Sequence, residues 1–195
     1  MSVKTLTPIQ SMEYLGRIGM TLDDWNRIEP LESATGAKGQ RHWINHPAPN
    51  AARDLLILSY LLATWLPQSS WVLFQLDHSG GLDVAQASVC TRVLTLPIGA
   101  DYSTVLFEFG DSENDNAETM LAIANLIFFL LLFQSHGAFV SSSSSNFECL
   151  SLQDGFVYFS AYEPTISGAH ALVSKFAKGP ELPEWVWRMD PRNAA

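Results

Sequence analysis

The sequence feature that most constrains the fold is a run of fourteen residues, Met120 to Phe133, that is apolar except for Asn125. A helix that is apolar on every side has no face to give to water, so it is either the buried centre of a folded domain or a membrane span. The run is shorter than the roughly 20 residues that a bilayer needs, and neither flank carries a basic anchor. We therefore interpret it as a core helix around which the rest of the chain packs.

Capping signals predict where this helix and a second apolar helix begin. Asp115 with Glu118 three residues later has the form of a capping box, which gives part of the acidic stretch before the helix a purely local role. Asn50 is expected to cap a second apolar helix over 51–66, which Pro67 ends. Shorter helices are expected at three places: after the Thr7–Pro8 pair, from Trp25 to Ile28, and near His170 to Phe176.

Several segments alternate apolar and polar residues or are rich in β-branched and aromatic residues, which is typical of strands. The predicted strands are Trp71–Leu76, Ser88–Leu96, Tyr102–Phe109, Gly137–Val140, Phe147–Leu152 and Phe156–Ala161, with a short extended piece around Trp43. Asp154–Gly155 between the last two is a strong hairpin signal.

The order of these elements predicts an α+β fold. We expect a mixed or mainly antiparallel sheet of about five to six strands with two long apolar helices packed on one face. At 195 residues and 47% hydrophobic residues, the chain can bury a substantial core, and a single domain over 1–195 is expected. Within it, residues 1–50 are interpreted as an irregular region with short helices, and residues 51–195 as the core.

The charge distribution is lopsided. The net charge is −9, and between Asp54 and Ser174 twelve Asp and Glu residues face a single base, Arg92. Such a field repels phosphate backbones and anionic lipids and steers cationic partners toward itself. We therefore expect a basic protein as partner, and neither nucleic acid nor a membrane. The other interpretation, a surface that only keeps the protein in solution, stays open.

No motif in the sequence specifies a reaction, so no catalytic residue, metal or cofactor is predicted. His42 and His46 have the spacing of a helical metal pair, but Pro47 argues against a helix there. Asp77–His78 lacks an activated nucleophile with which to form a triad. Asp111, Glu113 and Asp115 resemble the start of a calcium loop without its glycine or its final glutamate. Cys90 and Cys149 are expected to be reduced, partly buried thiols.

Localisation is predicted from the first residues. The segment before Pro8 has one lysine but no apolar stretch behind it, so it does not read as a secretory signal, and a cytoplasmic protein is expected.

In overall character the chain resembles the immunity proteins that bacteria keep against their own secreted toxins. The resemblance lies in its size, its α+β pattern, its acidity and the absence of a catalytic motif. It implies a protein that binds a cognate toxin, often a basic nuclease, and occludes the active site or substrate groove. The candidate contact residues are the acids Asp101, Asp111 and Glu113 and the aromatic anchors Trp43, Trp185 and Trp187.

Two alternatives remain open. The same acidity fits a phage- or plasmid-encoded inhibitor or adaptor that mimics nucleic acid. A small hydrolase with an unrecognised site is the other, and it would be favoured if His42, His46 or His78 met a carboxylate in a pocket.

Overall fold

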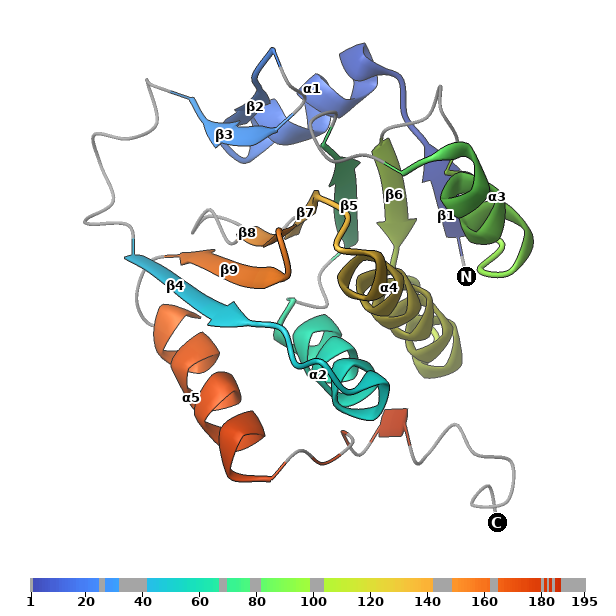
Figure 1. Cartoon of the computed structure of the whole chain (residues 1–195). Helices are drawn as coiled ribbons and strands as arrows, with labels where there is room; N and C mark the ends of the chain where they lie inside the picture. The colour runs from blue at the N-terminus through green and yellow to red at the C-terminus, as the bar shows by residue number, and fades with distance from the viewer. Residues whose placement is uncertain are drawn as a thin grey trace.

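The computed structural model describes residues 2–24, 27–31, 42–66, 70–77, 82–98, 104–141, 149–161, 165–179, 181, 183 and 185–186, with the backbone alone at His42 and Trp43. Within these residues, seven strands form one sheet, called the main sheet here, in which every neighbouring pair is antiparallel (Figure 1). In spatial order they are β1 (Ser2–Thr5), β6 (Thr104–Glu108), β5 (Trp71–Leu76), β7 (Gly137–Ser141), β8 (Cys149–Gln153), β9 (Phe156–Ala161) and β4 (His42–Pro47). A separate antiparallel pair joins β2 (Met20–Leu22) to β3 (Ile28–Pro30).

The described parts also contain five helices. They are α1 (Pro8–Arg17), α2 (Ala52–Trp65), α3 (Val84–Arg92), α4 (Glu113–Phe133) and α5 (Thr165–Lys178). The α+β class and the mainly antiparallel sheet are therefore confirmed. The expected strand count of five to six is too low, because β1 and β4 from the first fifty residues form the two edges of the main sheet.

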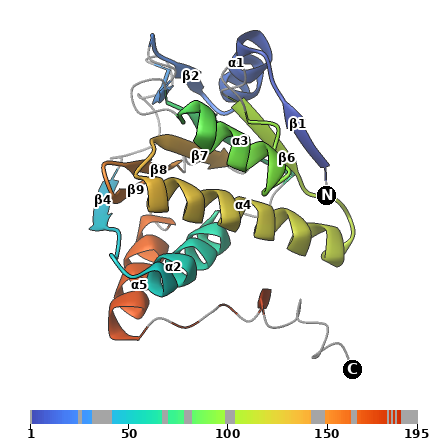
Figure 2. The ribbon, with the colours of Figure 1, turned by 45° about the vertical axis from the view of Figure 1, so that its right-hand side comes forward.

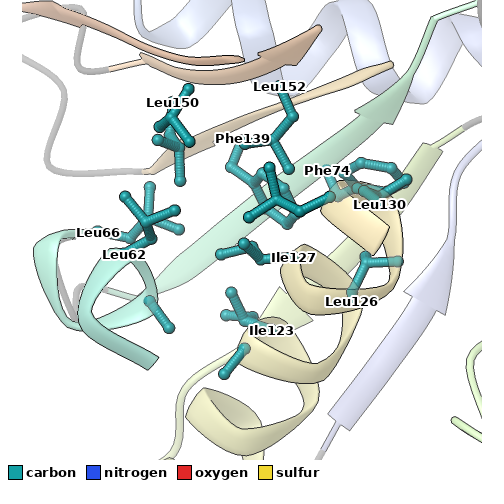
Figure 3. Packing of buried hydrophobic residues seen from close by; sticks show 14 of the residues in the cluster. Leu62, Leu66, Phe74, Ile123, Leu126, Ile127, Leu130, Phe139, Leu150 and Leu152 are labelled. Atoms are coloured by element: carbon teal, nitrogen blue, oxygen red, sulfur yellow. The ribbon is translucent and has the colours of Figure 1, made fainter. Parts of the chain in front are cut away.

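The first face of the main sheet is covered by the two apolar helices, which pack against each other (Figure 2). Leu62 and Leu66 at the end of α2 and Ile123 and Ile127 of α4 meet Phe139 of the sheet in one buried cluster (Figure 3). The pair does not cover this face alone. Helix α5 packs on β4, β9 and α2, and α3 joins the same cluster through the fully buried Cys90.

Helix α4 is long and apolar enough to cross a membrane by length and composition alone, and half of its most apolar eighteen residues are buried in the protein. Those buried side chains lie against α2 and the main sheet, as expected for a core helix.

The second face of the main sheet is covered in part by α1 and the β2–β3 pair. Leu15 of α1 and Met20 of β2 are buried against Leu73, Leu106 and Val140, which belong to the central strands. Beyond β8 this face is covered unevenly: Ser160 of β9 is buried, whereas Phe156 of the same strand keeps 38% of its surface exposed.

Two segments fold differently from their predicted type. Ser88–Leu96 was expected to be a strand, but its first half belongs to α3, whose N-cap Asp83 forms a complete capping box with Gln86. A helix was expected from Trp25 to Ile28, yet Ile28 begins β3, and Trp25 lies outside the described residues. In both cases a short amphipathic pattern is compatible with a helix or a strand. The helix cap in α3 and the pairing of β3 with β2 determine which of the two forms.

The predicted caps have mixed outcomes. Thr7 and Gln10 form a capping box at α1. Helix α4 begins at Glu113 with Ser112 as its N-cap and no side-chain cap bond, so the predicted box from Asp115 to Glu118 does not form. The N-cap of α2 is Ala51, also without a side-chain bond, rather than Asn50.

The Asp154–Gly155 hairpin between β8 and β9 is confirmed. Both residues have positive φ, 51° and 75°, which is the geometry of a tight turn that matches the twist of the strands it joins.

Candidate partner-binding site

The candidate site is built at the start of α4, where the chain leaves β6. Asp111, Glu113 and Asp115, called the acidic head here, all lie exposed at this end of the helix. Two of them are in the first turn, where a carboxylate is stabilised by the helix dipole. The local structure thus explains why acids are tolerated here, and it also leaves them at the surface.

A hollow of about 540 Å³ opens beside the acidic head. It is lined by Ser2, Ser70, Trp71, Glu108, Phe109, Gly110 and Asp115. Two hydrogen bonds shape it: the Phe109 backbone N–H donates to the Ser70 carbonyl (3.1 Å), and the Gly110 N–H donates to Asn116 Oδ1 (2.9 Å). The half-buried Trp71 ring is held edge-on by Tyr14, with ring centroids 5.2 Å apart. The hollow therefore combines carboxylates with aromatic side chains.

The two carboxylates of the hollow differ in their surroundings. Glu108 Oε2 lies 2.6 Å from Lys4 Nζ and accepts a hydrogen bond from Ser2 Oγ (2.7 Å). The bond from Lys4, followed by the bond from Ser2, lowers the pKa of Glu108. The charge of Glu108 is thus largely offset by Lys4, and Asp115 is the acid that joins the hollow to the acidic head. A Lys or Arg side chain of another protein would find a carboxylate and a ring there.

Two of the other predicted contact residues, Trp185 and Trp43, lie elsewhere in the described structure. Trp185 lies against α2, where its Nε1 donates to Thr64 Oγ1 (2.9 Å) and its ring centroid is 5.4 Å from that of Tyr60. Trp43 stands in β4 opposite Ser160, at the other edge of the main sheet from β1 and the start of α4 (Figure 1). Asp101 and Trp187 lie outside the described residues. Among the four predicted contact residues that the structure describes, Asp111 and Glu113 lie together at the start of α4.

The two histidines with the spacing of a helical metal pair lie in a strand, which agrees with the argument from Pro47 against a helix there. His42 and His46 lie in β4, where residues four apart are separated by roughly 13 Å. His46 Nδ1 lies 2.6 Å from the carbonyl oxygen of Pro47, and its ring contacts Phe176 of α5. Within the described part of the chain, no three His, Cys, Asp or Glu side chains are grouped so that they could hold a metal ion. Asp77 is buried at the end of β5, and His78 lies outside the described residues.

One histidine that we did not single out does meet a carboxylate. His136 Nε2 is 3.0 Å from Asp154 Oδ1, and this pair ties the β8–β9 turn to the residue before β7. The other ring nitrogen, Nδ1, is buried without a hydrogen-bond partner. The sequence contained one signal for this contact, the Asp154–Gly155 turn. This turn lies at the end of β8, which pairs with β7, so Asp154 comes close to the residue before β7.

The thiol of Cys90 is poorly suited to catalysis. It is fully buried, and burial raises its pKa to about 11, so very little reactive thiolate exists at neutral pH.

No protein-family model matches the sequence, and neither the curated proteins nor the solved structures contain a match.

Proposed function

We propose that this protein binds a cognate bacterial toxin and neutralises it by covering the active site or substrate groove of the toxin with an acidic surface. The observation that carries the proposal is the exposed acidic head beside a hollow that contains both Asp115 and Trp71. Carboxylates attract Lys and Arg, and an aromatic ring offers a cation an additional contact once water is excluded.

The charge of the whole chain supports a basic partner. The twelve acids against Arg92 between Asp54 and Ser174 create a long-range field, which raises the rate of encounter with a positively charged protein. A nuclease-type toxin fits this field, because an enzyme that binds a phosphate backbone needs a cationic groove. Covering such a groove with carboxylates would stop substrate from entering it.

The direct test is capture followed by inhibition. The tagged full chain is used to isolate a bound protein from the cells that carry it, and the bound protein is then assayed for cleavage of plasmid DNA and total RNA. We expect a basic protein whose activity falls in proportion to the amount of this chain added. An acidic bound protein, or a basic one whose activity is unaffected, contradicts the proposal.

The role of the acidic head is tested with a double variant, Asp111→Asn with Glu113→Gln. Because rim charges act mainly on association, we expect the association rate at low salt to fall about two- to tenfold, with a smaller effect on dissociation. The matched control, Glu13→Gln with Glu181→Gln, removes the same charge from exposed positions outside the acidic head and should change the rate far less. Association that does not slow as salt rises would also count against electrostatic docking.

A further inference from the structure

A row of side chains that are polar except for Ala138 crosses the second face of the main sheet. The strand pairing places these residues side by side: Thr104, Gln75, Ala138, Ser151, Tyr158 and Asn45. The adjacent row on the same face begins with Leu106, Leu73 and Val140, and it is buried under α1 and β2. Thr104 and Gln75 at the start of the polar row are also buried, whereas Asn45 at its far end is exposed.

A small hollow of about 140 Å³ lies over this polar row, next to the β2–β3 pair. Its polar lining residues are Arg27, Gln75, Asp77, Ser151 and Gln153. Gln75 and Asp77 are 1% and 8% exposed, whereas Gln153 lies at the surface. The amide of Gln75 is fixed in place because its oxygen accepts from Thr104 and its nitrogen donates to the Leu76 carbonyl. Polar side chains from three parts of the chain therefore converge on one space.

The charges around this hollow are negative on balance. Arg27 lines it, but its guanidinium is held by Asp23 through Nε (2.8 Å) and Nη2 (2.7 Å) to one carboxylate oxygen. The bond to Asp23, and to a lesser extent the charges of Asp77 and Glu29, raise the pKa of Arg27, so more than one carboxylate acts on this single base. A cation entering the hollow would therefore be attracted.

An aromatic ledge borders the polar wall of the hollow. The register places Tyr158 opposite Ser151 and Phe156 opposite Gln153, on the same face of the sheet. Their ring centroids are 6.2 Å apart, and Phe156 is 38% exposed. An aromatic surface beside a negative, hydrogen-bonding hollow matches the chemistry of a guanidinium group, which is planar, carries five N–H donors and stacks on rings.

We propose that this hollow, the arginine slot, receives the guanidinium group of an arginine that a cationic protein partner presents over Phe156 and Tyr158. Asp77, Ser151 and Gln153 supply acceptor oxygens, and the volume of about 140 Å³ suits the tip of one side chain rather than a larger ligand. The proposal rests on the proposed function for the source of the arginine. The slot lies on a different part of the surface from the acidic head, so the two can be tested separately.

The slot is tested with a matched pair of peptides, acetyl-Gly-Arg-Gly-amide and its citrulline analogue, which keeps the shape and loses the charge. Each is titrated into the 195-residue chain at low salt while backbone ¹H–¹⁵N shifts are followed. We expect the arginine peptide to shift the amides of Ser151, Gln153 and Tyr158 with a millimolar Kd, and the citrulline peptide to bind at least about fivefold more weakly. Equal shifts with both peptides, or none at these amides, overturn the proposal.

Two substitutions at the exposed Gln153 give a test that leaves the buried residues unchanged. Gln153→Glu should lower the Kd of the arginine peptide about two- to fivefold, and Gln153→Lys should raise it by at least as much. Asp77→Asn should also weaken binding, and its thermal unfolding shows whether the fold survives the change. Glu13→Gln, at an exposed acid outside both hollows, is the control and should leave the Kd of the peptide unchanged. A Kd that changes as much for Glu13→Gln as for the Gln153 variants contradicts the slot.

These outcomes separate the slot from the proposed function. If the peptide binds as expected and no basic toxin is captured, the slot stands and the function fails. If a captured toxin responds to the double variant of the acidic head but not to Gln153→Lys, the function stands and the slot is overturned.

Discussion

The two faces of the main sheet are covered to different extents. On the first face, α2, α4, α5 and α3 share one buried cluster that includes Phe139 and Phe159 of the sheet. On the second face, α1 and the β2–β3 pair bury a smaller cluster around Leu73, and Phe156 of β9 stays 38% exposed. Phe159 and Phe156, three residues apart in β9, therefore point toward very different surroundings.

This difference separates the surface that stabilises the fold, the first face, from the surface that is accessible to another molecule, the exposed part of the second face. The first face supplies most of the apolar area removed from water, and such burial is the main source of stability. The second face combines the arginine slot and the aromatic ledge with a smaller core. Changes on the first face should therefore act on stability, and changes on the exposed part of the second face should act on binding.

The largest expected effect contrasts the two faces within β9. Phe159→Ala removes a fully buried ring from the first-face core and should lower the free energy of unfolding by about 3–5 kcal/mol. Phe156→Ala, three residues earlier on the second face, should cost about 1 kcal/mol or less. Urea denaturation measures both. Equal losses would show that the second face is buried as fully as the first.

A smaller effect is expected at the helix starts, one from each face. Thr7→Ala removes the capping box of α1, on the second face, and should cost about 1 kcal/mol. Asn50 precedes α2, on the first face, but the N-cap of α2 is Ala51 and no side chain caps the helix. Asn50→Ala should therefore change the unfolding free energy by about 0.5 kcal/mol at most. A larger loss for Asn50→Ala than for Thr7→Ala would contradict the cap assignments.

A pH-dependent effect is expected at the edge of the second face. The pKa of Glu108 is lowered by Lys4 and Ser2, so its contribution to stability is present above the pKa of an unfolded glutamate and is lost as the pH falls through the lowered value. Glu108→Gln should therefore be less stable than the wild type at neutral pH, and the gap should close on acidification. Unfolding curves across this pH range test it, and Lys4→Gln should remove most of the same pH dependence.

The last comparison needs no substitution, because it measures how fast a reagent labels the two cysteine thiols, one on each face. Cys90 is fully buried in the first-face core, and Cys149 is 4% exposed in the second-face cluster. With a thiol reagent in native buffer, we expect Cys149 to react first and Cys90 to react only as the protein unfolds, because burial also raises the pKa of Cys90 to about 11. Mass spectrometry of digests identifies each site. Faster labelling at Cys90 would reverse the comparison.

The strongest local patterns in the sequence predicted their elements well. The α4 run, the α2 helix and the strands β5, β6, β7 and β9 were predicted because long apolar segments and the Asp154–Gly155 turn act over short distances. Helix α3 was missed because its nine residues bury Cys90 alone, so its apolar pattern is weak and its Asp83 cap is the clearer signal.

The candidate site was predictable only in part. Asp111 and Glu113 were identified from the sequence, because an acidic stretch before an apolar helix must lie near the helix start. The hollow beside them joins Ser2, Trp71 and Glu108 from three strands. The arginine slot likewise joins Arg27, Asp77 and Gln153, and no local pattern connects residues so far apart.

The sequence by itself determined that this chain forms an α+β fold around an apolar helix and carries a strong excess of negative charge, since both follow from composition and periodicity. Tertiary structure decided the rest: β1 pairs with β6, matching Ser2 to Glu108, and β4 closes the opposite edge beside β9. Those pairings place the exposed aromatic ledge on the half of the second face away from α1. The physical reason is that strand pairing depends on contacts between segments that are distant in the sequence. The free energy of these contacts comes from the whole core, so no single segment of the sequence specifies the pairing.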